Sequence, residues 1–102
     1  MAQQKRPPKL ADVLELVRMA VEAGNFLDTV HASVRQQQRA ITRPEYLYIL
    51  KNGFHEKAKD TYEPIYLTWK YAIRGKTVDK RDLRVIVTFK DSLLIITVME
   101  VV

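Results

Sequence analysis

The chain has 102 residues, of which 47% are hydrophobic, so it can enclose one modest core and is too short for a second large domain. Seventeen Lys and Arg against twelve Asp and Glu give a net charge of +5, which favours polyanionic partners such as nucleic acid. The absence of Cys excludes disulfides and thiolate metal sites, and the two His residues lie 24 positions apart. We therefore expect no metal and no other cofactor.

Residues 1–8 are predicted to form a flexible basic tail, because Pro7 and Pro8 cannot donate backbone hydrogen bonds. Residues 9–102 then form a single domain. Asp12, Glu15 and Arg18 interrupt the segment where the apolar part of a signal peptide would lie. We therefore expect a cytoplasmic protein that makes no contact with membranes.

Two helices are predicted first. The first contains an apolar stripe with spacings of three and four residues and ends at Gly24; its stripe is Val13, Leu14, Val17, Ala20 and Val21. The second begins at Asp28 or Thr29, either of which can cap it, and directs Val30, Val34 and Ile41 inward.

A third helix follows directly. Thr42 and Glu45 have the spacing of a capping box, and Pro44 suits the first turn. Asn52 and Gly53 provide the stop. The buried stripe is expected to be Tyr46, Leu47, Ile49 and Leu50.

After Gly53 the hydrophobic period changes from helical to alternating, which is typical of strands. Strands are predicted over 54–62, 65–74, 83–90 and 93–101, with a short hairpin at 90–92 and a longer basic one at 75–81. The third strand is expected to direct Leu83, Val85, Val87 and Phe89 to one side. The predicted fold is therefore α+β, with N-terminal helices packed on one face of a four-stranded antiparallel sheet.

The second helix carries the most informative pattern. His31, Arg35 and Arg39 are spaced by four, so they lie along one helical face. An imidazole that transfers protons near neutral pH, in line with two guanidiniums, suits a phosphodiester substrate. The simpler interpretation is that His31 packs against the domain and the two arginines lie in solvent.

The chain resembles a small bacterial domain-of-unknown-function family related to the MqsR and RelE/ParE toxins. The resemblance covers about residues 5–100 and depends on His31-Ala32-x-x-Arg35, Arg39-x-Ile41, Trp69 to Gly75, Asp82 to Val85, and Leu94 to Val98. It implies the fold of the barnase, colicin-tRNase and RelE group, whose members cut RNA without a metal ion. It also implies a toxin neutralised by a separate antitoxin protein.

Metal-free RNA cleavage uses the 2′-hydroxyl of the substrate, so the protein must move protons and neutralise the phosphorane. We assign proton transfer to His31 and phosphate binding to Arg35 and Arg39. Arg84 and Lys70 are expected to stabilise the phosphorane from the sheet, and Thr97 to fix the geometry through a side-chain hydrogen bond. The remaining predicted RNA contacts are Lys57, Tyr71, Arg74, Lys76, Lys80 and Arg81.

Several alternatives stay open. Arg84 and Lys70 also fit the solvated side of a half-buried strand, Trp69 fits the core, and His55 is either a second proton-transfer group or an exposed turn residue. The tyrosine that is catalytic in MqsR-type toxins falls near Asp82, and their C-terminal lysine near Val98 or Met99.

The main competing function is therefore a non-enzymatic basic module that binds an acidic protein or nucleic acid. A DNA-binding regulator is a third option, although the second helix has no typical turn before the next one. The expected partners are RNA and an antitoxin, and homodimerisation is left open.

Overall fold

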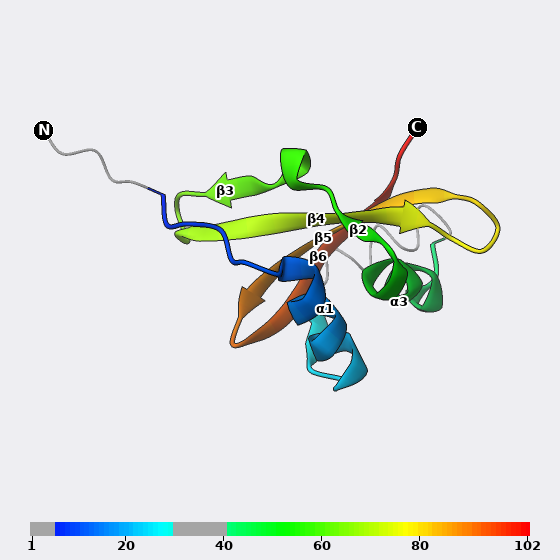
Figure 1. The fold of residues 1–102 in the computed structure, drawn as a ribbon, viewed down its shortest axis with the longest axis horizontal. Coiled ribbons are helices and arrows are strands. Elements are labelled where there is room, and N and C mark those ends of the chain that lie inside the picture. The colour runs from blue at the N-terminus through cyan, green and yellow to red at the C-terminus, as the bar shows by residue number, and fades with distance from the viewer. Residues whose placement is uncertain (1–5, 30–40) are drawn as a thin grey trace, which may run out of the picture.

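The computed structural model describes residues 6–29 and 41–102 (Figure 1). These residues form the helices α1 (Val13–Glu22) and α3 (Arg43–Asn52) and a short 3-10 helix, η1 (Lys57–Lys59). They also form a mixed six-stranded sheet, so the expected α+β class is confirmed. The strands are β1 (Phe26–Asp28), β2 (Phe54–His55), β3 (Thr61–Glu63), β4 (Thr68–Lys76), β5 (Asp82–Lys90) and β6 (Ser92–Glu100).

The strand order is β1-β6-β5-β4-β2, and β3 also pairs with β4. The long strands β4, β5 and β6 form the antiparallel meander that the alternating pattern predicts. Asp91, in a left-handed conformation (φ 65°), forms the tip of the predicted hairpin between β5 and β6. The described sheet nevertheless has six strands where four were predicted, and β1 runs parallel to β6.

Strand β1 contains Asp28, one of the two expected starts of the second helix, whereas a start at Thr29 stays a prediction. Asp28 pairs with Ile95 of β6, and its carboxylate accepts a hydrogen bond from the Tyr46 hydroxyl (2.5 Å), so Asp28 does not cap a helix. Three residues are too few to produce a readable alternation, which is why the strand was missed. Residues 30–40 of the predicted helix lie outside the described residues, whereas Ile41 is buried as expected.

The predicted strand over 54–62 is divided into β2, η1 and β3. At the division, the backbone of Ala72 in β4 has no strand partner on this side. Instead, the Glu56 amide donates to the Ala72 carbonyl (2.8 Å), and the Asp60 carboxylate accepts from the Ala72 amide (2.9 Å). A side chain thus completes the hydrogen bonding of the buried backbone, which a period-based prediction cannot anticipate.

The core lies between the sheet and the two helices, which cover the same face of the sheet (Figure 1). Helix α1 contributes Val13, Val17 and Val21, and α3 contributes Tyr46, Ile49 and Leu50. The strands contribute Tyr71, Ile73, Leu83, Val85, Val87, Leu93, Ile95 and Val98. Since strand side chains alternate, the other residues of β4, β5 and β6 point to the opposite side.

The end of α3 fixes the sheet edge. The predicted capping box of Thr42 and Glu45 is present at its start, and the Gly53 amide donates to the Ile49 carbonyl (2.7 Å) at its end. A Cβ atom on Gly53 would lie 2.5 Å from the Arg74 carbonyl oxygen. Glycine therefore allows α3 to end directly against β4, which places β2 in the sheet.

Candidate nucleic-acid interface

The side of the sheet that faces away from α1 and α3, here called the outer sheet face, gathers several of the predicted site residues. In an antiparallel sheet, paired residues point to the same side. Arg84 pairs with Arg74 on one flank and with Met99 on the other, and the next row is Ala72, Ile86 and Thr97. The outer sheet face consists of Lys70, Ala72, Arg74, Lys76, Asp82, Arg84, Ile86, Thr88, Leu94, Thr97 and Met99. The fold thus brings Arg84 and Thr97 onto one surface with three of the predicted RNA contacts.

Two guanidiniums on this face share one carboxylate. Arg84 donates to both oxygens of Glu56, from Nε (2.7 Å) and from a terminal nitrogen (3.3 Å). Arg74 donates to Glu56 (2.8 Å) and makes a two-point contact with Asp82 (3.1 and 2.7 Å). The two arginines are therefore held side by side in fixed orientations, with part of their charge neutralised.

These contacts lower the pKa values of both carboxylates. Hydrogen bonds from Arg84, and then from Arg74, hold the pKa of Glu56 below its usual range. The hydrogen bond from Arg74 does the same for the pKa of Asp82. The bonds that Arg74 donates, to Asp82 first and then to Glu56, raise the pKa of Arg74, so Glu56, Asp82 and Arg74 all stay ionised near neutral pH.

Thr97 and Lys70 occupy the outer sheet face with different neighbours. Among the described residues the Thr97 hydroxyl has no hydrogen-bond partner, so the predicted bond to a site arginine is not seen with Arg84. The Lys70 ammonium lies 3.8 Å from Glu63, at the limit of an ion pair. Both side chains are half-buried.

The basic hairpin at 75–81 is ordered by its own polar groups. The Arg81 amide donates to the Thr77 hydroxyl (3.0 Å), and the Arg81 guanidinium lies between Glu45 (3.3 Å) and Glu100 (3.4 Å). Lys76 and Lys80 are exposed. The ammonium groups of Lys76 and Lys80 are therefore in solvent, whereas the Arg81 guanidinium links α3 to the end of β6.

His55 belongs to a separate buried cluster. Its Nε2 atom lies 2.8 Å from the Asp60 carboxylate, whose side chain has no exposed surface, and the Lys9 ammonium lies 3.0 Å from the same oxygen. The ring meets Tyr71 edge-on, with centroids 5.7 Å apart. His55 is the one imidazole in the described part of the chain. Asp60 holds it in one orientation, as carboxylates do for proton-transfer histidines.

Two predicted RNA contacts lie beside this cluster. Tyr71 is only 3% exposed, and its hydroxyl accepts a hydrogen bond from the Leu10 amide (2.9 Å), so its ring is closed to base stacking in this structure. Lys57 is exposed on η1, and its carbonyl accepts from Lys9 (3.3 Å). A cavity of about 440 Å³ opens here between Lys9, Lys57, His55 and the first turn of α1.

His31, Arg35 and Arg39 lie outside the described residues, so their predicted roles remain predictions. Their position affects the net charge of the described part of the chain. Lys5, Arg35 and Arg39 are outside the described ranges and none of the twelve Asp and Glu is, so the described part carries a net charge of +2. Most of the excess positive charge of the chain thus belongs to these three residues.

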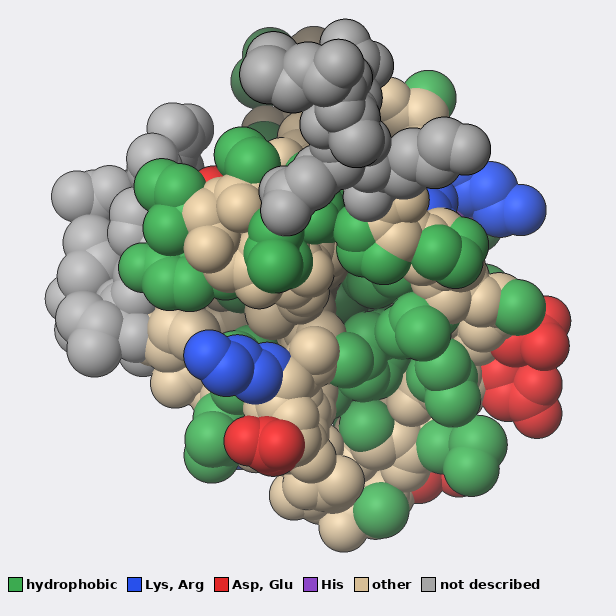
Figure 2. Space-filling view, turned by 90° about the vertical axis from the view of Figure 1, so that its left-hand side faces the viewer, with side chains coloured by type: hydrophobic (Ala, Val, Ile, Leu, Met, Phe, Trp, Pro, Cys, Tyr) green, Lys and Arg blue, Asp and Glu red, His purple; other side chains and the backbone are tan. Residues whose placement is uncertain are grey.

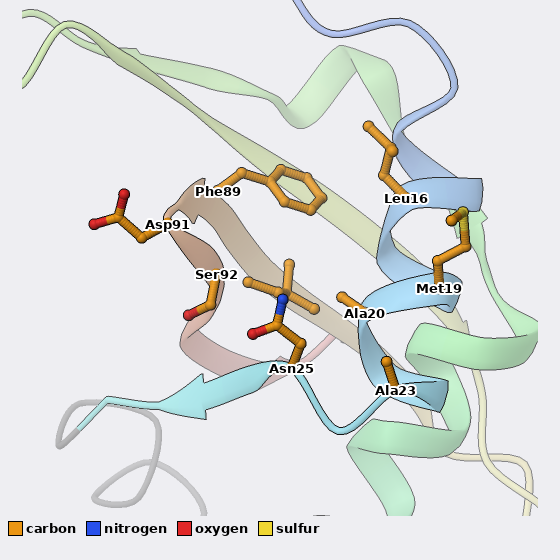
Figure 3. Close-up of a pocket in the computed structure, with 9 residues that line it drawn as sticks. Leu16, Met19, Ala20, Ala23, Asn25, Phe89, Asp91 and Ser92 are labelled. Carbon is orange, nitrogen blue, oxygen red and sulfur yellow. The ribbon is translucent and has the colours of Figure 1, made fainter.

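A further cavity of about 440 Å³ lies between α1 and the hairpin of β5 and β6 (Figure 3). Leu16, Met19 and Phe89 form apolar walls, and Asn25 and Ser92 lie on one side. No Lys or Arg lines it. It therefore does not suit a phosphate group.

The sequence interpretation missed the carboxylates that organise both clusters. Glu56 and Asp60 were given no role there, and Asp82 entered only as part of the motif Asp82 to Val85 and as the position near which MqsR-type toxins carry a catalytic tyrosine. The position of Glu56 and Asp60 close to a glycine stop was the only available signal, and it does not reveal their partners on β4 and β5.

Within residues 6–29 and 41–102, no group of three or more His, Asp or Glu side chains is arranged to hold a metal ion. Neither described helix combines the length and the apolar character needed to cross a membrane.

The fold and the charged sheet face define a small α+β domain with a candidate surface for anionic polymers. A family model described as a domain of unknown function (DUF4258) matches residues 29–100, and the chain belongs to that family. Neither the curated proteins nor the solved structures contain a significant match. The matched segment begins after α1, although α1 contributes to the same core.

Proposed function

We propose that this protein is a metal-independent endoribonuclease of the toxin type, with a RelE-like fold, and that an antitoxin protein neutralises it in the cytoplasm. The observation that carries the proposal is the outer sheet face, where the strand register places Arg84, Thr97, Arg74 and Lys70 on one surface. The resemblance to MqsR and RelE/ParE toxins supports the reaction class, and the DUF4258 match leaves the activity open.

In the proposed reaction an imidazole removes the proton of the RNA 2′-hydroxyl. The 2′-oxygen then forms a bond to phosphorus, and the bond between phosphorus and the 5′-oxygen breaks. The departing oxygen takes up a proton, which leaves a 2′,3′-cyclic phosphate and a 5′-hydroxyl. His31 transfers the proton, Arg35 and Arg39 bind the phosphate, and Arg84 with Lys70 stabilises the added negative charge.

The test is incubation of purified protein with mixed RNA in EDTA. Cleavage with cyclic-phosphate ends is expected, and His31→Ala should slow it about 10²- to 10⁴-fold. His55→Ala, measured in parallel, separates the two imidazoles. A His31→Ala protein that cuts as fast as the parent would show that the assignment is wrong.

A second candidate function is a non-enzymatic module that binds nucleic acid or an acidic protein. Glu56 and Asp82 favour it, because they neutralise part of the charge that a phosphorane would need from Arg84 and Arg74. In the same incubation, intact RNA with salt-sensitive binding supports this candidate.

A further inference from the structure

The hairpin formed by β3 and β4 concentrates aromatic rings and cations. Tyr62 and Trp69 pair across the two strands, with ring centroids 5.3 Å apart. Cations lie over the rings in four contacts: Arg6 over Tyr62 (5.4 Å) and over Trp69 (5.8 Å), Lys9 over Trp69 (4.9 Å), and Lys90 over Tyr66 (6.0 Å). One further cation–π contact is found in the described part of the chain, between Arg43 and Phe26.

The tip of this hairpin is strongly apolar and exposed. Ile65 is 80% exposed, Tyr66 71% and Leu67 60%, and Leu67 has a left-handed backbone (φ 53°), which is uncommon for a leucine. In Figure 2, which looks at this end of the molecule, hydrophobic side chains spread over much of the surface, and a few Lys or Arg and Asp or Glu side chains lie among and beside them. An apolar cluster of this kind indicates a contact surface.

The charges around the hairpin select the partner. The cations are Arg6, Lys9, Lys70 and Lys90, and the nearby carboxylates are Asp60, Glu63 and Asp91. Asp60 is fully buried against Lys9 and His55, and Glu63 faces Lys70. These groups sum to a net charge of +1, and outside the two ion pairs Arg6 and Lys90 face the exposed Asp91. The surroundings of the rings thus carry a small excess of positive charge, which fits an anionic chain with planar groups. Single-stranded nucleic acid has this chemistry.

The N-terminal segment holds two of these cations in place. The Pro7 carbonyl accepts a hydrogen bond from the Trp69 indole (2.8 Å), and the Leu10 amide donates to the Tyr71 hydroxyl (2.9 Å). The last residues of the predicted tail thus lie against β4, and Arg6 and Lys9 are presented beside the rings.

We propose that the hairpin of β3 and β4 is a binding site for single-stranded RNA, distinct from the outer sheet face. Tyr66 stacks on a base, and Lys90 and Arg6 contact the phosphates on either side. The inference depends on the proposed function for RNA as the ligand, but it concerns binding and not cleavage.

The chain provides its own reporter, because Trp69 is its single tryptophan. Titration with a uridine 12-mer in EDTA should change the Trp69 fluorescence. Tyr66→Ala should weaken binding roughly 5- to 150-fold, the range for losing one base-stacking aromatic, and Tyr66→Phe should retain it. Lys90→Ala should lower the slope of log affinity against log salt by about 0.7. The matched control is Tyr48→Ala, since Tyr48 is an exposed tyrosine on α3 (40%).

Each outcome is decisive. Unchanged affinity of Tyr66→Ala for the 12-mer overturns the inference, as does a fluorescence response to anionic phosphatidylglycerol vesicles but not to RNA. If RNA binds with the expected Tyr66 dependence but is not cut, the inference holds and the endoribonuclease proposal fails. If RNA is cut and Tyr66→Ala leaves KM unchanged, the endoribonuclease proposal holds and the inference fails.

Discussion

Replacement of Glu56 by Gln tests whether Arg84 binds RNA phosphates on the outer sheet face. Glu56 accepts two hydrogen bonds from Arg84 (2.7 and 3.3 Å) and one from Arg74 (2.8 Å). Gln retains one accepting oxygen but no charge, so Arg84 loses its ion pair and keeps, besides that neutral acceptor, only a long contact to the Met99 sulfur (3.8 Å). Arg74 keeps both bonds to Asp82. The substitution therefore releases one guanidinium and not two.

The expected change in salt dependence follows from the release of one guanidinium. Each additional phosphate neutralised on a single strand steepens the slope of log affinity against log salt by about 0.7. Glu56→Gln should therefore bind RNA more tightly at low salt, with a slope steeper by about 0.7 rather than about 1.4. The variant should also unfold more readily, because two half-buried guanidiniums lose a charged partner.

The assay is fluorescence anisotropy of a labelled RNA 12-mer at four salt concentrations. Glu22→Gln is the matched control, because it makes the same change in net charge at an exposed position of α1. If Glu56→Gln and Glu22→Gln change the slope equally, the effect is one of net charge, and the reasoning about Arg84 is refuted.

Three further predictions concern the fold. Thr42→Ala removes the capping box of α3 and should lower the free energy of unfolding in urea by about 0.5–2 kcal/mol; an unchanged midpoint contradicts this role. Gly53→Ala should lower the Tm measured by calorimetry more than Gly24→Ala does. A Cβ atom at position 53 would lie 2.5 Å from a backbone oxygen, whereas a Cβ atom at position 24 (φ 71°) would face open space. A larger loss for Gly24→Ala would contradict the close approach of Gly53 to β4. Folding lowers the pKa values of Glu56 and Asp82, so these carboxylates stabilise the fold above the ordinary carboxyl pKa of about 4, and this stabilisation is lost as pH falls through the folded-state values. In urea titrations across this pH range, the free energy of unfolding of Glu56→Gln should therefore fall less steeply with decreasing pH than that of the parent. Identical pH profiles would contradict the ion pairs of Glu56 as the cause.

The elements that the sequence predicted well are those whose signals are local. The stripe of α1, the capping box at Thr42 and the alternation of β5 each depend on neighbours along the chain. Strand β1 and the division of residues 54–62 depend instead on distant partners, Ile95 for Asp28 and Ala72 for Asp60. Single-sequence periodicity contains no record of such partners.

The same limit applies to the candidate site. Alternation along β5 and β6 is enough to place Arg84 and Thr97 on one face. It does not show that Glu56 neutralises Arg84, because Glu56 comes from the irregular edge beyond β2. Nor does it show that Asp60 holds His55, since that pairing needs the turn of η1 to bring the two side chains together.

The central claim is that the protein cuts RNA through the substrate's own 2′-hydroxyl. The most direct measurement is mass spectrometry of a uridine-containing RNA oligonucleotide after incubation in EDTA, beside the same sequence with every 2′-hydroxyl methylated. The account predicts fragments with 2′,3′-cyclic phosphate and 5′-hydroxyl ends from the first oligonucleotide and none from the second. An intact RNA oligonucleotide, or equal cleavage of both, would contradict it.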